Sequence, residues 1–259
     1  MSLQRAACSR QQAVSGRAAS IGLVLLLLTS ACGGSASESQ VLVSAASSLT
    51  NAFADIEQAF EAENPGVDIL LNVAGSSLLR EQILGGAPVD VFASASSAVM
   101  QMVVDAGLAD EPAIFAGNRL QIGVPAGNPA GVVGIEDFAD EKLLIGLCAQ
   151  AVPCGALARE ILIDAGIEPA IDTSEPDVRS LLTKLEVGEL DAGIVYLTDV
   201  IASDEVIGIE IPDVLDPVTD YLIAVVADAP NLSGAQDFVA FVLSAEGQQI
   251  LTAHGFTAP

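Results

Sequence analysis

Short apolar strands alternate with amphipathic helices from Val41 onward, and this alternation limits the fold more than any other feature of the chain. The first three strands are each followed by a helix, and they are expected at 41–45, 67–73 and 89–93. The first of these helices has one apolar face, which is formed by Leu49, Phe53, Ile56 and Phe60. Three consecutive βα units predict a parallel sheet with helices on its faces.

The second half of the chain continues the pattern with too many elements for one small sheet. Further strands are expected at 120–125, 143–148, 193–196, 206–211 and 221–226. Helices are expected at 155–165, 177–186 and 234–243, with a last helical segment at 247–251. We therefore predict an α/β protein with two lobes, the first at 41–117 plus 220–259 and the second at 118–219. The chain would cross between the lobes near Asn118 and near Thr219.

A short apolar run near the N-terminus predicts export. Three arginines precede it, its unbroken apolar centre at 23–28 is too short to span a bilayer, and small residues and Cys32 follow. This order resembles a lipoprotein signal peptide at 1–31, with Cys32 lipidated as the new N-terminus and a flexible tether at 32–40. Ordinary signal cleavage nearby is an alternative, because Thr29 stands where Leu is commoner, and a buried strand is a weaker one.

The charge of the exported chain excludes two classes of partner. Removal of the signal takes away three arginines and no acidic residue, so 6 basic residues remain against 34 acidic ones, a net charge of −28. Nucleic acids and anionic membrane surfaces are therefore not expected as partners. A solvated acidic surface is the simplest interpretation.

Cysteine and histidine usage narrows the chemistry. Export would leave Cys148 and Cys154 as the cysteines of the folded part, and their spacing of six predicts a short-loop disulfide. His254 is the only histidine, and no G-x-S-x-G motif occurs. We therefore expect no catalytic residues, no metal cation held by direct ligands, and no cofactor.

Small residues recur where helices begin. Ser48 and Ser76 each follow a strand, Cys154 stands beside Gly155 after Pro153, and Val178 lies in the first turn of another helix. The first turn of a helix has unpaired N–H donors and a positive potential, so it binds anions. Four such helix starts meeting between two lobes would bind an anion without a cationic side chain, although a plain N-cap is the simpler role for either serine alone.

These residues lie in segments that resemble the periplasmic molybdate-binding proteins of ABC importers, which are type II solute-binding proteins. The segments are VSAASSLTNAF, AGSSLLREQILGGAPVDVFASAS, VPCGALARE, PDVRSLL and AGIVYLTDV, and they occur in the order found in the family. The resemblance covers residues 41–259. It implies the type II periplasmic binding protein fold, two α/β lobes hinged around a ligand cleft, with molybdate or tungstate held by neutral donors.

The resemblance also assigns roles by position. Ser48 and Ser76 would each donate a hydroxyl and a backbone N–H, Cys154 and Val178 would donate backbone N–H groups, and Tyr196 its phenolic hydroxyl. The chain departs from the pattern at Cys154, where a small residue such as Ala is familiar. Because that position acts through its N–H, the exchange leaves ligation intact and permits a disulfide that would rigidify the binding loop.

The function expected from these features is capture of molybdate and tungstate by an exported, lipid-anchored monomer. It would work in the periplasm or on the outer face of the cytoplasmic membrane and deliver its ligand to an ABC permease, without catalysis. A different tetrahedral oxyanion such as sulfate or phosphate is the nearest alternative. An enzyme that uses Cys154 as a nucleophile and a purely structural surface lipoprotein are two further ones.

Overall fold

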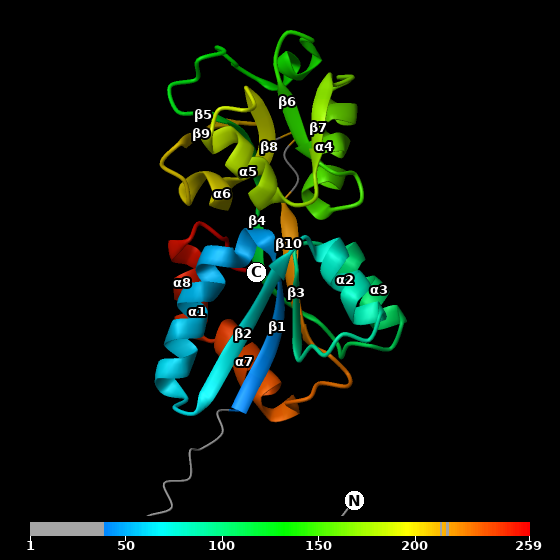
Figure 1. The fold of residues 1–259 in the computed structure, drawn as a ribbon, viewed down its shortest axis with the longest axis vertical. Helices are drawn as coiled ribbons and strands as arrows, with labels where there is room; N and C mark the ends of the chain where they lie inside the picture. The colour runs from blue at the N-terminus through cyan, green and yellow to red at the C-terminus, as the bar shows by residue number, and fades with distance from the viewer. Residues whose placement is uncertain (1–38, 213, 216–217) are drawn as a thin grey trace, which may run out of the picture. The chain divides into compact units, whose positions relative to one another are not determined.

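Two five-stranded sheets with helices on their faces form the part of the chain that the computed structural model describes, residues 39–212, 214–215 and 218–259 (Figure 1). All of these residues belong to one compact unit. The two-lobed α/β architecture predicted from the sequence is therefore confirmed. The predicted signal peptide at 1–31, the lipidation site Cys32 and the tether up to residue 38 lie outside the described residues.

The first sheet has a parallel core closed by an antiparallel strand. Its strands, in spatial order, are β2 (Val67–Ala74), β1 (Ser39–Ala46), β3 (Val91–Ser94), β10 (Thr219–Val225) and β4 (Ala113–Asn118). Strand β1 pairs in parallel with β2 and β3, as the run of βα units predicts, and β10 pairs antiparallel with β3 and β4. The C-terminal part of the chain is thereby joined to the lobe in which the chain starts.

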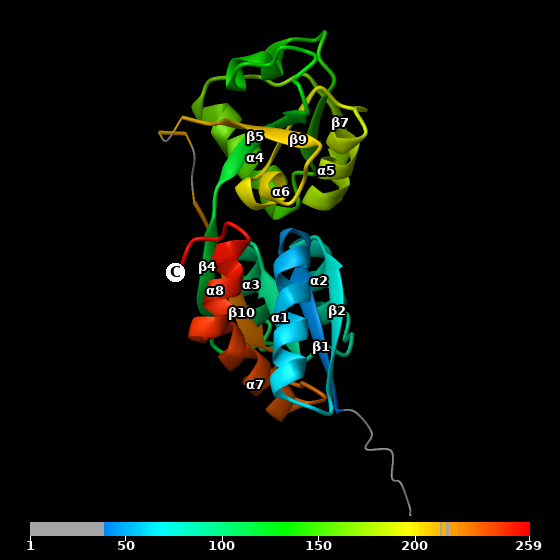
Figure 2. The ribbon, with the colours of Figure 1, turned by 90° about the vertical axis from the view of Figure 1, so that its left-hand side faces the viewer.

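Helices cover both faces of the first sheet (Figure 2). One face carries α1 (Thr50–Glu63), α7 (Leu232–Leu243) and α8 (Ala245–Ala253), and the other carries α2 (Ser76–Leu84) and α3 (Ser97–Asp105). The predicted apolar face of α1 is buried, and its Phe53 and Phe60 both make edge contacts with Phe238 of α7. Tilted and edge-on rings of this kind pack densely and fix the helices on the sheet.

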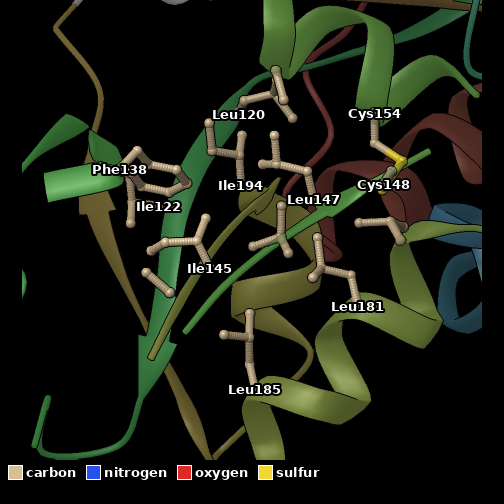
Figure 3. Close-up of a cluster of buried hydrophobic side chains, with 14 of the residues drawn as sticks. Leu120, Ile122, Phe138, Ile145, Leu147, Cys148, Cys154, Leu181, Leu185 and Ile194 are labelled. Carbon is tan, nitrogen blue, oxygen red and sulfur yellow. A yellow bond between two sulfur atoms is a disulfide. The ribbon is translucent and has the colours of Figure 1, made fainter. Parts of the chain in front are cut away.

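The second sheet has the same arrangement around a separate core (Figure 3). Its strands, in spatial order, are β7 (Ile171–Glu175), β6 (Ile145–Cys148), β8 (Ala192–Tyr196), β5 (Leu120–Pro125) and β9 (Val206–Glu210). Its helices are α4 (Pro153–Asp164), α5 (Val178–Glu186), α6 (Leu197–Ile201) and the 3-10 helix η2 (Ile135–Ala139). The first lobe has one 3-10 helix as well, η1 (Ser47–Leu49), which follows β1. Leu181 and Leu185 of α5 pack toward Ile145 of β6 in the core.

The chain passes between the two sheets twice. Strand β4 ends at Asn118 and β5 begins at Leu120, whereas β9 ends at Glu210 and β10 begins at Thr219. Asn118 and Thr219 pair with each other in the first sheet, so both belong to this sheet rather than to the second lobe, where the sequence assignment placed them. Strand β1 likewise begins at Ser39, where pairing with β2 extends the strand into residues assigned to the tether.

Three elements were not expected from the sequence: β4, β7 and α6. Strand β7 has one apolar residue, Ile171, followed by four polar ones, and α6 is a single short turn after Tyr196, so neither has a long apolar pattern. Helix α4 begins at Pro153, two residues earlier than predicted, because proline is suited to the first turn of a helix. Cys154 therefore lies inside that first turn.

Within the described residues, each helix is too short or too polar to cross a membrane.

Candidate functional site

The parallel strands of both sheets end at one cavity between the lobes. Strands β1 and β2 lead into η1 and α2, and strands β6, β7 and β8 lead into α4, α5 and α6. The cavity contains about 220 Å³ of space free of protein atoms, part of which is open to the solvent. It is lined by Ala46, Ser47, Ser48, Gly75, Ser76, Ala95, Val152, Pro153, Cys154, Asp177, Val178 and Tyr196. All five residues predicted as ligand contacts are among these, and none of the lining residues is Lys, Arg or His.

The first turns of three helices surround the cavity. Helix α2 begins at Ser76, α4 at Pro153 and α5 at Val178. The first N–H groups of a helix have no acceptor inside the helix, and the aligned peptide dipoles add positive potential there. The N-terminal end of η1, with Ser48, adds a fourth segment. Backbone donors from both lobes therefore supply the positive potential that cationic side chains would supply elsewhere.

The hydroxyls of Ser48 and Ser76 each have a partner in the first lobe. The Ser48 Oγ lies 2.7 Å from the hydroxyl of Tyr221, and the Ser76 Oγ accepts the backbone N–H of Ala95 at 3.1 Å. Both serines are buried. These contacts fix the two hydroxyl oxygens at the wall of the cavity.

The Tyr196 hydroxyl is buried and has no hydrogen-bond partner among the described residues. Tyr196 is 2% exposed and ends β8 at the cavity wall. Burial, with smaller contributions from Tyr221 and Asp199, raises the pKa of Tyr196 well above its usual value, so the hydroxyl keeps its proton. A buried donor without an acceptor is costly. A ligand with acceptor atoms in the cavity would remove that cost.

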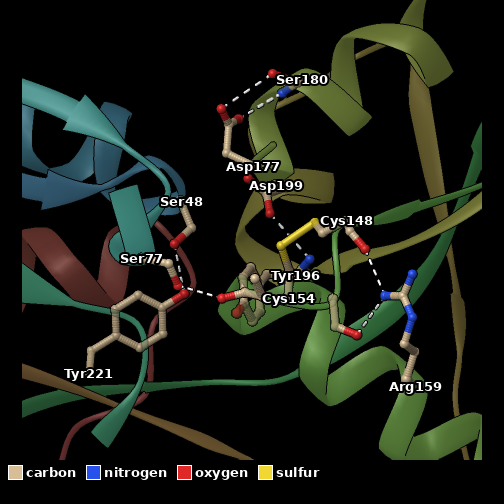
Figure 4. The surroundings of a disulfide bond; sticks show 12 residues. Ser48, Ser77, Cys148, Cys154, Arg159, Asp177, Ser180, Tyr196, Asp199 and Tyr221 are labelled. Atoms are coloured by element: carbon tan, nitrogen blue, oxygen red, sulfur yellow. Dashed lines mark hydrogen bonds between the residues drawn. A yellow bond between two sulfur atoms is a disulfide. The ribbon is translucent and has the colours of Figure 1, made fainter. Parts of the chain in front are cut away.

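The predicted disulfide is present and closes the loop before α4 (Figure 4). Cys148 and Cys154 are 5.8 Å apart at their Cα atoms, and Arg159 donates to the carbonyls of Cys148 and Gly155. A Cβ at Gly155 would lie only 2.1 Å from the carbonyl oxygen of Ala149, so the loop needs glycine there. The disulfide and Arg159 thus fix the first turn of α4 at the cavity.

Contacts between the lobes surround the cavity. The Ser77 hydroxyl of α2 donates to the carbonyl of Ala151 in the disulfide loop at 2.5 Å. The Arg179 guanidinium of α5 donates to the Asn51 side-chain oxygen of α1 at 3.4 Å. Gly75 faces the second lobe so closely that a Cβ there would lie 2.9 Å from the carbonyl oxygen of Pro176. The two lobes are therefore in close contact on the α2 side of the cavity.

Asp199 is a buried carboxyl next to the site that the sequence did not identify. Its Oδ2 accepts the backbone N–H of Tyr196 at 3.2 Å, and its Oδ1 lies 3.8 Å from the Arg179 guanidinium. Burial raises the pKa of Asp199 to about 7, because the attraction of Arg179 and the Tyr196 N–H offsets only part of the desolvation; Asp177 and Glu186 raise it further. A titratable group therefore supports the strand end that carries Tyr196.

Sequence reasoning gave no place in the site to Tyr221 or Ser77, and it named Asn118 only as the point where the chain crosses between the lobes. Tyr221 had one available signal. The chain has only two tyrosines, Tyr196 and Tyr221, and their rings lie 6.1 Å apart in the structure.

Comparisons with known proteins agree with this arrangement. A family model described as "Bacterial extracellular solute-binding protein" matches residues 41–257. The molybdate-binding protein ModA of Mycobacterium tuberculosis is 37% identical over 255 residues, which cover 93% of this chain and 98% of that protein.

Two solved structures share the fold. The sulfate-binding protein SubI of Mycobacterium tuberculosis superposes with a TM-score of 0.75 at 18% identity, over 85% of this chain and 87% of that one. The periplasmic molybdate-binding protein of Azotobacter vinelandii gives a TM-score of 0.71 at 17% identity, over 85% of this chain and 99% of that one.

Asp199 predicts a distinctive pH dependence of stability. Between about pH 4 and pH 7 the folded protein keeps a proton that the unfolded chain releases, so the free energy of unfolding falls as the pH rises through this window and then levels off. In urea unfolding, the free energy of unfolding of wild type should fall by roughly 3 kcal/mol more between pH 5 and pH 8 than that of Asp199→Asn. Asp228→Asn, at an exposed position, is the control and should follow wild type. Equal pH dependence in wild type and Asp199→Asn would contradict this account.

Proposed function

The chain belongs to the bacterial extracellular solute-binding protein family, and we propose that it captures molybdate and tungstate outside the cytoplasm for delivery to an ABC importer. The observation that carries this proposal is the buried Tyr196 hydroxyl, a donor without an acceptor in a cavity bounded by helix N-termini from both lobes. The similarity to a molybdate-binding protein over nearly the whole chain favours this oxyanion.

We assign the ligand contacts to Ser48, Ser76, Cys154, Val178 and Tyr196. Both serines would donate a hydroxyl and a backbone N–H, Cys154 and Val178 a backbone N–H, and Tyr196 its hydroxyl. In support, all five line one cavity and come from both lobes. The division into two lobes fits the same assignment, because each lobe supplies part of the ligand contacts and the two connections between the lobes would act as the hinge.

The donor set suits a fully deprotonated tetrahedral dianion. Burial of such an ion is expensive unless hydrogen bonds replace its hydration. Hydrogen bonds to a charged group contribute roughly 1.5–3 kcal/mol each, so the seven proposed donors could offset much of that cost. The oxyanion is the cargo, and the site needs neither a metal cation nor an organic cofactor.

Two competing functions are less well supported. A thiol enzyme would need Cys154 as a free nucleophile, whereas its sulfur is bonded to Cys148. Sulfate is a closer competitor, because it too is an acceptor-only dianion and because a sulfate-binding protein shares the fold. The size of the cavity in the ligand-bound protein, rather than the kind of donor, would separate sulfate from molybdate.

The N-terminal segment and the charge of the chain bear on where the protein works and what it contacts. Lipidation of Cys32 after removal of residues 1–31 would hold a monomer at the periplasmic or outer face of the cytoplasmic membrane. The short polar tether would leave the two lobes free to approach the permease. The strongly acidic composition is consistent with an exported binding protein whose partners include no nucleic acid.

Thermal unfolding with added oxyanions tests the function. With molybdate or tungstate at about 1,000 times the dissociation constant, the folded state should gain roughly 4 kcal/mol, a rise in Tm of about 10 °C for a chain of this size. Sulfate and phosphate at the same concentration should give smaller shifts. A larger shift with sulfate would replace the ligand, and no shift with any of the four anions would refute capture of oxyanions.

Gly75→Ala tests whether close contact of the lobes is needed for binding. Gly75 has φ −60°, so alanine causes no backbone strain, but its Cβ would press on the Pro176 carbonyl of the second lobe. The affinity for molybdate, measured by calorimetry, should fall about tenfold, because such overlap typically costs about 1–3 kcal/mol. Gly134→Ala, away from the cavity, should keep wild-type affinity. Unchanged binding by Gly75→Ala would show that the lobes need not approach this closely.

A further inference from the structure

We propose that the Cys148–Cys154 disulfide is a redox switch for the oxyanion site, in which the disulfide form captures the ligand and the dithiol form binds it weakly. This switch rests on the proposed function and adds a means of regulation to the same site. The reason is the place of the bond, because the short loop that it closes forms one wall of the cavity.

The loop between the two cysteines supplies a continuous part of the cavity lining. Val152, Pro153 and Cys154 all line the cavity, and the Cys154 backbone N–H is one of the proposed ligand donors. The carbonyl of Ala151, in the same loop, accepts the hydroxyl of Ser77 from the first lobe. The loop thus carries proposed ligand contacts and a contact between the lobes, so its position bears directly on capture.

The disulfide anchors this loop to the interior of the second lobe. Cys148 is the last residue of β6 and is fully buried, and Cys154 lies in the first turn of α4 and is 4% exposed. Both cysteines belong to the hydrophobic core of that lobe. Strand β6 lies inside the sheet, between β7 and β8. The bond therefore fixes the start of α4 relative to a strand that cannot easily move.

Few other contacts hold the middle of the loop. The Ala149 N–H donates to the Glu175 carbonyl at 2.7 Å, and the Val152 N–H donates to the Ala149 carbonyl at 3.0 Å. Gln150 and Ala151 are exposed. Without the disulfide, most of the restraint on these exposed residues is lost.

Arg159 holds the two ends of the loop and not its middle. Its guanidinium donates to the carbonyls of Cys148 at 2.7 Å and Gly155 at 2.9 Å (Figure 4). These hydrogen bonds do not depend on the S–S bond. We therefore expect the reduced protein to stay folded, with α4 in place and a mobile loop in front of it.

A dithiol reductant would operate the switch. It passes two electrons and two protons to the disulfide, so that the Cys148–Cys154 bond breaks, each cysteine becomes a thiol, and the two sulfurs of the reductant form a disulfide. A ligand that binds the reduced protein must then order the loop again, a cost that the closed loop avoids. Capture would thereby be confined to oxidising surroundings, where disulfides form and persist.

The ligand and the reductant must oppose each other to the same extent. When two events are coupled in one molecule, each changes the equilibrium of the other by the same factor. If reduction weakens binding by a given factor, saturating ligand makes reduction of the bond less favourable by that factor. The size of the coupling can therefore be measured in two independent ways.

Binding of tungstate to the oxidised and the reduced full chain is the first measurement. The chain is reduced with dithiothreitol, which is removed under nitrogen before calorimetry so that it does not bind the anion. Reduction should raise the Kd about tenfold, the effect expected when roughly one more residue must be ordered on binding.

The second measurement is the ratio of reduced to oxidised dithiothreitol at which half of the Cys148–Cys154 bond is reduced. Alkylation followed by mass analysis of the peptide that contains both cysteines gives the reduced fraction. Saturating tungstate should raise this ratio by the same factor of about ten.

Cys148→Ala/Cys154→Ala is the matched control. It lacks the bond, retains the backbone N–H at position 154, and still contains Cys8 and Cys32. This variant should bind tungstate as weakly as reduced wild type, whether or not it has been treated with dithiothreitol. Far-ultraviolet circular dichroism should be the same for oxidised wild type, reduced wild type and the variant.

An equal Kd for oxidised and reduced wild type would overturn the inference, and so would a half-reduction ratio that tungstate leaves unchanged. Loss of the folded state on reduction would also overturn it, because the change is assigned to one loop. Failure of oxidised wild type to bind any of the four oxyanions is a separate result, because it would refute the proposed function itself.

Discussion

The parallel strands of both sheets end at the same cavity, and the site depends on this constraint. Because a helix or helical turn follows each of these strands directly, first turns from the two lobes are brought together without any long loop. Their free N–H groups and aligned dipoles create a positive potential in a chain whose formal net charge is −25. The placement of β10 beside β3 and β4 completes the arrangement, because it returns the chain to the first sheet, so that the chain passes between the lobes twice.

A site without cationic side chains must hold its donors rigidly, since each contributes little alone. The disulfide and Arg159 hold the start of α4, Asp177 caps α5, and Asp199 supports the strand end that carries Tyr196. These supports lie one contact away from the cavity. Residues that would touch the anion are thus distinct from the residues that fix their position.

Much of the fold could be predicted from the sequence, because the first lobe has strong apolar periodicity and clear helix stops. The face of α1 with Phe53 and Phe60 is buried as expected, and the five predicted ligand residues line one cavity. Strand β7 and helix α6 were missed because one is polar and the other is a single turn. Asp199 and Tyr221 could not be found by local pattern, since their importance comes from partners on distant parts of the chain.

We propose that an oxyanion is held in this cavity by neutral donors from both lobes. A crystal structure of the protein with tungstate tests it most directly, because the anomalous signal of tungsten locates the ion independently of the protein. We expect one tungsten peak, with its oxygen atoms within hydrogen-bond distance of the donors of Ser48, Ser76, Cys154, Val178 and Tyr196. A tungsten peak held elsewhere by arginine or lysine side chains, or a cavity left without tungsten, would contradict it.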